Sequence, residues 1–129
     1  SCGQHHVAAI GFHGTVRHAG DGRQIPEYQL HLGGGFNEEG VEFGRHIVKI
    51  PAQRSGEALL ALLDLYRDER EPGEAARAFF KRVTKERVAA ALGEHIIGMS
   101  FDNLREQDLV DLGQEKVFDV AIGRGECAA

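Results

Sequence analysis

The segments SCGQHHVAAIGFHG (residues 1–14) and YQLHLGGG (residues 28–35) decide the fold of this chain. Within the first segment, Val7–Phe12 is short and apolar and is followed by a glycine-bearing pair, which is typical of a buried strand. Within the second, Tyr28–Leu32 alternates apolar and polar side chains, which indicates a half-buried strand. We expect the two strands either to pair as a long-loop hairpin or to lie apart in one sheet.

Three consecutive glycines, Gly33, Gly34 and Gly35, end the second of these strands. Glycine adopts positive φ angles and lets another group come close to the main chain. Two interpretations stay open, namely a pocket wall whose amides face an anionic or planar ligand, and a flexible loop. No Gly-Lys-Ser/Thr follows the glycines, so the turn is not a phosphate-binding loop of the Walker type.

Two further strands are predicted downstream. Arg45–Ile50 is rich in β-branched residues and is stopped by Pro51, and Val117–Ile122 is a late strand. Between the first two strands, residues 18–24 contain Asp-Gly and predict a loop. Pro26 is expected at the entry of the second strand, because proline has no N–H to donate to a sheet.

The middle of the chain is predicted to form three amphipathic helices. The first is capped by Ser55, the second has Pro72 in its first turn, and the third runs from Thr84 to Gly93. A weaker helix is expected over Asn103–Leu112. The helical period predicts these buried side chains: Leu59, Leu62, Leu63 and Tyr66 of the first helix, Ala75, Phe79, Phe80 and Val83 of the second, and Val88, Ala91 and Leu92 of the third.

These elements predict an α+β (or α/β) fold, with a small mixed sheet of three to four strands and helices packed mainly on one side. The 129 residues suffice for a single core. The sequence shows no internal repeat and no low-complexity segment.

The composition limits the function classes. The chain carries 20 acidic residues against 15 Lys and Arg, a net charge of −5, so it lacks the basic balance of general nucleic-acid-binding proteins. No apolar run approaches the roughly 20 residues that span a bilayer, and no signal segment opens the sequence. We therefore expect a cytoplasmic protein without nucleic-acid or membrane partners. Because residue 1 is Ser1 and strand-like sequence follows almost at once, we expect a piece of something longer.

Potential ligand side chains gather near the start of the sequence: Cys2, His5, His6, His13 and His18. Thiolate and imidazole bind zinc, but this spacing matches no compact ligand set, and strand alternation would point His5 and His6 to opposite faces. A nucleophilic pair of Cys2 with His5 or His31 would be poorly held so near a chain end. The second cysteine, Cys127, forms no CxxC motif. We expect no catalytic residue in this chain on its own.

Taken in order, several segments carry a resemblance: CGQHHVAAIGFHG, YQLHLGGG, RHIVKIPAQ, a helix ending YRDERE, and GEAARAFFKRV. Together they resemble the C-terminal part of siroheme-dependent nitrite and sulfite reductases, the nitrite and sulfite reductase four-iron four-sulfur domain family. The Leu-Gly-Gly strand at its distance from the cysteine is the most specific part. The resemblance implies a reductase-like domain over residues 1–97, starting at the last cluster cysteine, and an extension of unknown role over residues 98–129.

The resemblance also implies roles for particular residues. In the family, four cysteines in two motifs hold a four-iron four-sulfur cluster, and the last cysteine bridges the cluster to the siroheme iron. Cys2 matches that last cysteine and is the implied metal ligand. Gly33 and Gly34 would let the main chain come close to the siroheme. The other three cluster cysteines are absent from this sequence, so we expect the isolated chain to be inactive and to bind neither cofactor.

The whole reductase is implied to reduce nitrite to ammonia, or sulfite to sulfide, in a six-electron reaction. Its partners would be the remainder of the same chain and an electron donor such as ferredoxin or a flavoprotein. A second function class stays open, in which the chain is a stand-alone α+β binding or interaction module that kept the scaffold without the redox site. Upstream coding sequence with cluster motifs favours the reductase, whereas a start codon beside Ser1 favours the module.

Overall fold

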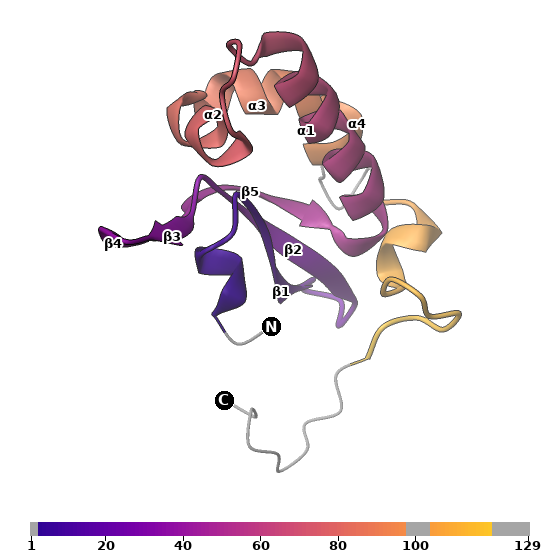
Figure 1. The fold of residues 1–129 in the computed structure, drawn as a ribbon. Helices are drawn as coiled ribbons and strands as arrows, with labels where there is room; N and C mark the ends of the chain where they lie inside the picture. The colour runs from indigo at the N-terminus through magenta and orange to yellow at the C-terminus, as the bar shows by residue number, and fades with distance from the viewer. Residues whose placement is uncertain (1–2, 98–103, 120–129) are drawn as a thin grey trace.

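The computed structural model describes residues 3–97 and 104–119. It contains a three-stranded sheet of order β1–β2–β5, with the main helices gathered on one face (Figure 1). The predicted α+β class and the one-sided helical layer are confirmed. The prediction of a mixed sheet is wrong, because both strand pairs of this sheet are antiparallel.

Strands β1 (Ile10–His18) and β2 (Gln24–Leu32) form a hairpin, paired from Ile10 opposite Leu32 to His18 opposite Gln24. Both predicted strands are present and paired. The first prediction, Val7–Phe12, was right only from Ile10 onward, since residues 7–9 are not in the strand, and β2 begins four residues before the predicted Tyr28. The expected loop is a tight turn in which Asp21 Oδ1 accepts the main-chain N–H of Arg23 at 3.0 Å. Such local bonding from an aspartate side chain explains how so short a turn closes the hairpin.

Strand β5 (Arg45–Pro51) pairs with the other edge of β2 and matches its prediction closely. Pro26 lies within β2, opposite Val16, rather than at its entry. Pairing of β2 with β5 begins only at Glu27, opposite Pro51. Proline is therefore tolerated at this position of a central strand, because β5 does not extend beside it.

A second, two-stranded sheet consists of β3 (Gly35–Asn37) and β4 (Gly40–Glu42), which the sequence did not predict. This hairpin projects from one side of the molecule (Figure 1). Glu42 attaches it to the helical layer through Arg77 at 3.1 Å and Lys81 at 2.8 Å. These partly exposed ion pairs contribute to the stability of the hairpin, because an isolated two-stranded ribbon is only marginally stable.

Helix α1 (Ser55–Glu69) follows directly on the 3₁₀ turn η2 (Ala52–Arg54). Ser55 was predicted to cap this helix, and that prediction is wrong by one residue, because Arg54 occupies the cap position. The Ser55 hydroxyl instead donates to the Ala52 carbonyl at 2.7 Å. The helix therefore begins as a direct continuation of the preceding 3₁₀ turn.

The buried face of α1 is rotated relative to the predicted one. Ala58, Leu62 and Leu65 are buried, whereas Leu59 is 38% exposed and Leu63 is 47% exposed. Leucines occur on both faces of this helix, so the helical period alone could not decide which face the sheet would cover. The prediction was right for Leu62 and wrong for Leu59 and Leu63.

Helices α2 (Ala76–Arg82), α3 (Lys85–Leu92) and α4 (Glu94–Ile97) complete the layer. The Thr84 cap of α3 is confirmed, since its Oγ1 accepts the Arg87 N–H at 3.1 Å, and Gly93 ends that helix. The second helix starts later than predicted, at Ala76, so Pro72 lies before its first turn. Among the described residues, no helix has the length and apolarity to cross a membrane.

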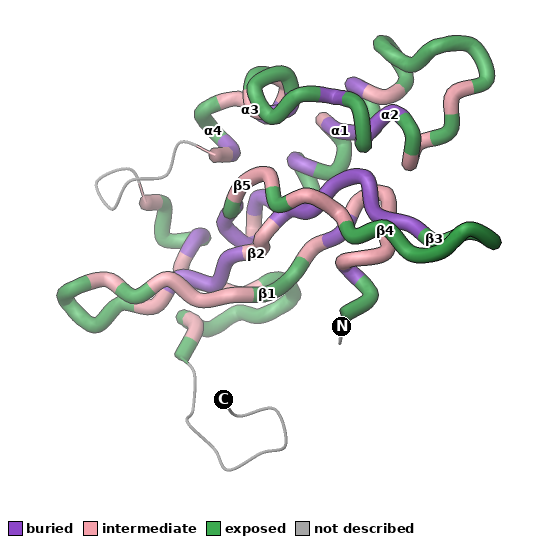
Figure 2. Tube along the Cα trace, turned by 90° about the vertical axis from the view of Figure 1, so that its left-hand side faces the viewer, coloured by how far each residue is buried: buried purple, intermediate pink, exposed green. Residues whose placement is uncertain are grey.

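The core lies between the sheet and the helical layer, as the buried stretches of β2, β5 and the helices show (Figure 2). Phe79 and Phe80 of α2 pack edge to face, with ring centroids 5.1 Å apart, and both are essentially fully buried. The buried members of the cluster are Leu30, Leu32, Ile50, Ala58, Leu62, Leu65, Phe79, Phe80, Val83, Val88, Leu92 and Ile96.

Residues 104–119 contain less regular structure than predicted. The helix expected over Asn103–Leu112 is a single 3₁₀ turn, η4 (Glu106–Leu109), and Asn103 itself lies outside the described residues. Of the strand expected over Val117–Ile122, Val117 forms one isolated antiparallel bridge with Val110. Residues 120–122 of that prediction also lie outside the described part.

A buried ion pair joins η4 to the start of the helical layer. The Arg54 guanidinium donates from Nε to Asp108 Oδ1 at 2.9 Å and from Nη2 to Asp108 Oδ2. Its Nη1 donates to the His95 carbonyl at 2.7 Å, and Asp108 Oδ2 also accepts the Arg105 N–H. The described part of the predicted extension is thus attached to the domain by a fully satisfied buried pair.

Candidate functional site

The glycine turn predicted as a pocket wall is buried, and protein occupies the direction of each missing side chain. A Cβ on Gly33, which has φ +84°, would come within 2.8 Å of Lys81 Cα. A Cβ on Gly34 would meet the His6 carbonyl oxygen at 2.2 Å, and one on Gly35 would meet the Arg77 side chain at 2.4 Å. Any ligand of this turn would therefore have to approach its main-chain atoms.

Cys2, the predicted metal ligand, lies outside the described residues, as does Cys127. The segment that follows Cys2 is described from Gly3, which has φ 86° and precedes the 3₁₀ turn η1 (Gln4–His6). A left-handed residue at this point suits glycine, which has no side chain to strain. The roles predicted for Cys2, Gly33 and Gly34 remain predictions.

Five imidazoles gather beside the glycine turn. His5 stacks on His13 with ring centroids 4.5 Å apart, and His6 lies 3.9 Å from His5. His31 of β2 lies 5.3 Å from His5 and 5.4 Å from His6, and His46 of β5 lies 5.5 Å from His31. We call these five residues the histidine cluster. Strand alternation was predicted to separate His5 from His6, and this is wrong because both lie on a 3₁₀ turn rather than on a strand.

Three members of the histidine cluster, His13, His31 and His46, have lowered pKa values. Burial first, then the charges of His5 and His6, lower the pKa of His13. Burial also lowers the pKa of His31, with His46 and His5 adding to the effect and a main-chain contact to Gly44 opposing it. These shifts favour uncharged rings near pH 7, each able to donate one hydrogen bond and accept another.

The pKa is also lowered for the member of the cluster on β5. Burial lowers the pKa of His46, and the charges of Lys85 and Lys49 lower it further. His31 is only 8% exposed, and neither of its ring nitrogens has a hydrogen-bond partner among the described residues. A buried polar group without a partner is costly, so such a group marks a place where a ligand or water gains free energy by binding.

The zinc hypothesis does not gain support from this arrangement. Within residues 3–97 and 104–119, no group of three or more His, Cys, Asp or Glu side chains is placed to hold a metal ion. His18, one of the predicted candidates, is the exposed last residue of β1. The alternative pairs of Cys2 with His5 or His31 are not tested, because Cys2 is outside the described residues. The close imidazole packing was missed from sequence, since its members come from separate elements.

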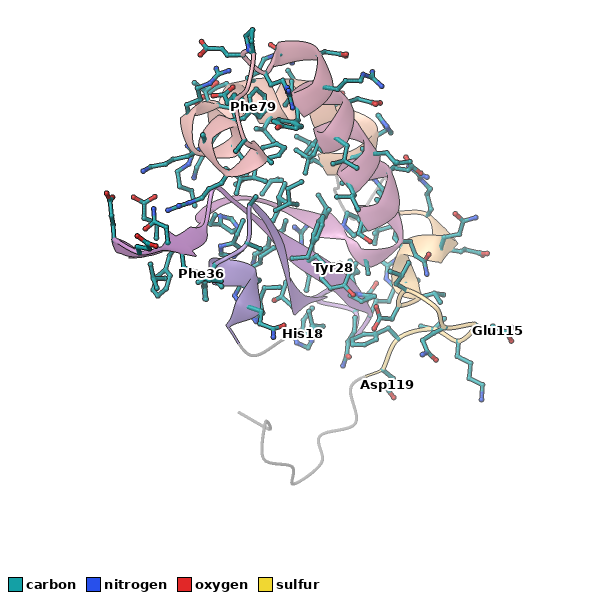
Figure 3. All side chains as sticks on the ribbon, viewed as in Figure 1. His18, Tyr28, Phe36, Phe79, Glu115 and Asp119 are labelled. Carbon is teal, nitrogen blue, oxygen red and sulfur yellow. The ribbon has the colours of Figure 1, made fainter. Side chains whose placement is uncertain are left out.

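An exposed apolar surface adjoins the histidine cluster. Phe36 and Val41 are opposite each other in the β3–β4 hairpin, and Phe43 follows directly after β4. Phe36 and Phe43 are each 72% exposed, and the Phe43 ring lies 5.4 Å from His6. Figure 3 shows Phe36 on the side of the hairpin away from Phe79 and the helical layer. Contiguous exposed apolar side chains of this kind are typical of surfaces that another group covers.

The fold and the site define an α+β domain with a buried glycine turn beside a histidine cluster. No family model matches the chain. It is 32% identical over 90 residues to sulfite reductase (ferredoxin) 1 of Mycolicibacterium paratuberculosis, a match that covers 68% of this chain and 16% of that protein. The structure of the Mycobacterium tuberculosis NirA protein is similar with a TM-score of 0.60 and 25% identity, covering 69% of this chain and 16% of NirA.

These matches confirm that the chain resembles the nitrite and sulfite reductases over about two thirds of its length. The similarity to NirA also confirms the α+β fold. The chain spans 16% of the length of each protein that it matches. What the complete proteins catalyse, bind and use as partners therefore enters only as a proposal.

Proposed function

We propose that this chain is the C-terminal part of a siroheme-dependent nitrite or sulfite reductase. The observation that carries the proposal is that similarity in sequence and similarity in fold each cover about two thirds of the chain. In the complete protein, Cys2 would supply the last thiolate of a four-iron four-sulfur cluster and bridge it to the siroheme iron. The Gly33–Gly34 turn would lie beside that cysteine and contribute main chain to the same site.

This chain does not fit a four-iron cluster by itself. Such a cluster is held by four thiolates, and the sequence contains only Cys2 and Cys127. The remaining ligands would come from the remainder of the same reductase chain. We therefore propose that the isolated chain is inactive and carries neither cofactor.

The exposed apolar side chains support the proposal that a neighbouring domain packs against this one. Leu60 is 64% exposed and Leu63 47% exposed on α1, in addition to Phe36 and Phe43 of the hairpin. A soluble single domain seldom leaves several large apolar groups uncovered. In the proposed reductase these surfaces would pack against the remainder of the chain, with ferredoxin or a flavoprotein as external electron donor and the cytoplasm as the compartment.

The first test is the coding sequence of the gene. We expect the reading frame upstream of Ser1 to encode cysteine motifs that complete the cluster, the last of them a Cys-x-x-x-Cys ending at Cys2. The complete protein should then show siroheme absorption and about four cluster irons per chain, and Cys2→Ser should remove both the cluster iron and the coupled spectrum. A start codon beside Ser1 would overturn the proposal and favour the stand-alone α+β module.

A further inference from the structure

Strand β1 is an edge of the three-stranded sheet, and half of its main-chain groups point away from β2. At one end of the strand, the Gly33 N–H donates to the Ala9 carbonyl at 2.9 Å. At the other end, the Ala19 N–H donates to the Arg23 carbonyl at 2.8 Å. The register between these bonds is unbroken, and bonding alternates along an antiparallel strand, so the odd-numbered residues bond to β2. The outward N–H and C=O groups belong to Ile10, Phe12, Gly14, Val16 and His18, which we call the outward row.

The outward row is unpaired in the part of the chain that the structure describes. No strand other than β2 pairs with β1, and no outward N–H donates to another main-chain group. Figure 2 shows β1 at the margin of the sheet, on the far side of β2 from β5. Gly14, at the middle of the row, is exposed and has no side chain to keep another main chain away. An unpaired row of this length is a template for a further strand.

The two edges of the sheet differ in how they are protected. The pairing of β5 has a register shift at His31, the strand ends at Pro51, and α3 and α4 pack against it. Bulges, prolines, charged side chains and covering helices all prevent edge strands from pairing with other chains. Strand β1 has a continuous register and contains no Pro, Lys, Asp or Glu. Its Arg17 side chain binds Glu27 of the neighbouring strand at 3.1 Å. The β1 edge therefore lacks the protection that the β5 edge has.

The outward row is self-complementary in the antiparallel direction. A two-fold axis at Gly14 places Gly14 opposite its own copy, Phe12 opposite Val16, and Ile10 opposite His18. Every one of these positions belongs to the outward row, so each pair of residues is able to exchange two hydrogen bonds. An aromatic side chain opposite a β-branched one is a favourable cross-strand pair. A register shifted by one residue would set outward groups against inward ones, so the two-fold register is specified.

An apolar hollow beside Phe12 offers room for a side chain of the incoming strand. Its volume is about 380 Å³, and its lining includes Phe12, Tyr28, Leu59 and Leu112. Leu59 is 38% exposed and Leu112 is 54% exposed. In the two-fold register, Val16 of the second copy stands opposite Phe12 on the same face of the sheet, and therefore beside this hollow. The pairing thus adds burial of apolar surface to the main-chain hydrogen bonds.

We propose that β1 is an interaction surface for a second copy of this chain, and that two copies join by antiparallel β1–β1 pairing about Gly14. The product is a closed two-fold dimer in which the two three-stranded sheets form one continuous sheet. Because one pair of strands and the side chains beside it make up the interface, the association is weak, as is typical of interfaces below about 1,200 Å². The inference does not rest on the proposed reductase function, since only described residues of this chain carry it.

The experiment measures association of the full chain by sedimentation equilibrium from about 10 μM to about 1 mM, a range suited to a weak interface. A reductant is present, so that no disulfide joins two copies. Gly14→Pro removes the central outward N–H and spares the inward bonds to β2, and Val16→Lys places a charge on the edge. Phe36→Ser and Leu60→Lys are the matched controls, because they change other exposed apolar surfaces. Hydrogen exchange of the β1 amides is recorded at both ends of the concentration range.

We expect the wild-type chain to pass from mainly monomer to mainly dimer across this range. In dilute solution the outward amides of Phe12, Gly14 and Val16 should exchange faster than those of His13 and Thr15, which bond to β2. At high concentration the outward amides should exchange at least about fivefold more slowly than in dilute solution. Gly14→Pro and Val16→Lys should each raise the dimer dissociation constant at least about tenfold, whereas the two controls should leave it unchanged.

Three results would overturn the inference: a wild-type chain that stays monomeric at the highest concentration, assembly beyond a dimer, or a dimer that Phe36→Ser or Leu60→Lys abolishes and Gly14→Pro retains. Dimerisation without slower exchange at Gly14 would also contradict it, and this wild-type measurement decides the question even if both β1 variants fail to fold. None of these results bears on the proposed reductase, which is judged separately by iron and absorption in the complete protein.

Discussion

Two buried polar groups beside the sheet differ in how they are satisfied. Where η4 packs against β2 and η2, the Arg54–Asp108 pair is bound by mutual hydrogen bonds and by bonds to the His95 carbonyl and the Arg105 N–H. At the Leu32 end of β2, His31 is buried with no partner for either ring nitrogen among the described residues. A satisfied buried network stabilises a fold, whereas an unsatisfied one costs free energy and marks a site.

The largest expected effect lies at the Arg54–Asp108 pair. Asp108→Ala leaves the Arg54 guanidinium buried without its partner, so the free energy of unfolding should fall by about 3–5 kcal/mol. Urea denaturation of the purified chain measures this loss. The control Asp64→Ala, which removes an exposed ion pair with Arg67, should change stability by less than about 0.5 kcal/mol.

A double replacement separates burial of charge from lost packing. Arg54→Met with Asp108→Leu removes both charges and keeps apolar volume, so it should recover most of the stability lost in Asp108→Ala. If the double variant is as unstable as the single one, the pair contributes through its hydrogen bonds to the His95 carbonyl and the Arg105 N–H, and not only through mutual neutralisation.

The histidine cluster should make the chain sensitive to acid. Desolvation lowers the folded-state pKa of the buried His31 and also of His13 and His46, whose side chains are exposed, so the unfolded chain binds protons first as the pH falls. Stability is therefore full above the unfolded histidine pKa of about 6.5 and is lost as the pH drops below that value toward the lower folded pKa values. Urea midpoints at pH 7.5, 6.5 and 5.5 should decrease in that order. A flat profile would contradict the lowered pKa values of His13, His31 and His46 in the folded chain.

Replacing His31 tests whether its unpaired nitrogens weaken the fold. His31→Leu removes two buried polar atoms and keeps a side chain of similar bulk, so the isolated chain should gain about 1–2 kcal/mol at pH 7.5. The same variant should lose less stability between pH 7.5 and 5.5 than the wild type. A destabilised His31→Leu chain would indicate that water or a ligand satisfies the imidazole in solution. His18→Leu, at the exposed end of β1, is the control.

The sequence predicted the parts of the fold that depend on apolar period and local caps. Alternation identified β2, the run stopped by Pro51 identified β5, and the Thr84 cap and the Phe79–Phe80 pair were located correctly. The buried face of α1 was partly wrong because leucines lie on both of its faces, and only packing against the sheet chooses between them.

The sites depend on contacts between distant residues, and these were missed. Arg54 and Asp108 are 54 positions apart, so no local pattern pairs them. The histidine cluster was not predicted, because His5 and His6 were assumed to alternate as in a strand, whereas they lie on a 3₁₀ turn. The glycine turn was recognised as a place of close approach, but its neighbours proved to be residues of the same chain: Lys81 at Gly33, His6 at Gly34 and Arg77 at Gly35.

The smallest expected effect concerns the segment after η4. Beyond Leu112 the hydrogen-bonding contacts of the described residues include one isolated bridge between Val110 and Val117 and main-chain hydrogen bonds from Gln114 to Asp111 and from Phe118 to Leu109. Deleting residues 113–129 should therefore reduce the free energy of unfolding by only about 1 kcal/mol, since it spares the Arg54–Asp108 pair. Urea denaturation of the truncated chain gives this value. A loss as large as that of Asp108→Ala would show that residues 113–129 stabilise the domain to the same extent as the buried pair, and an unchanged midpoint would argue against any added strand.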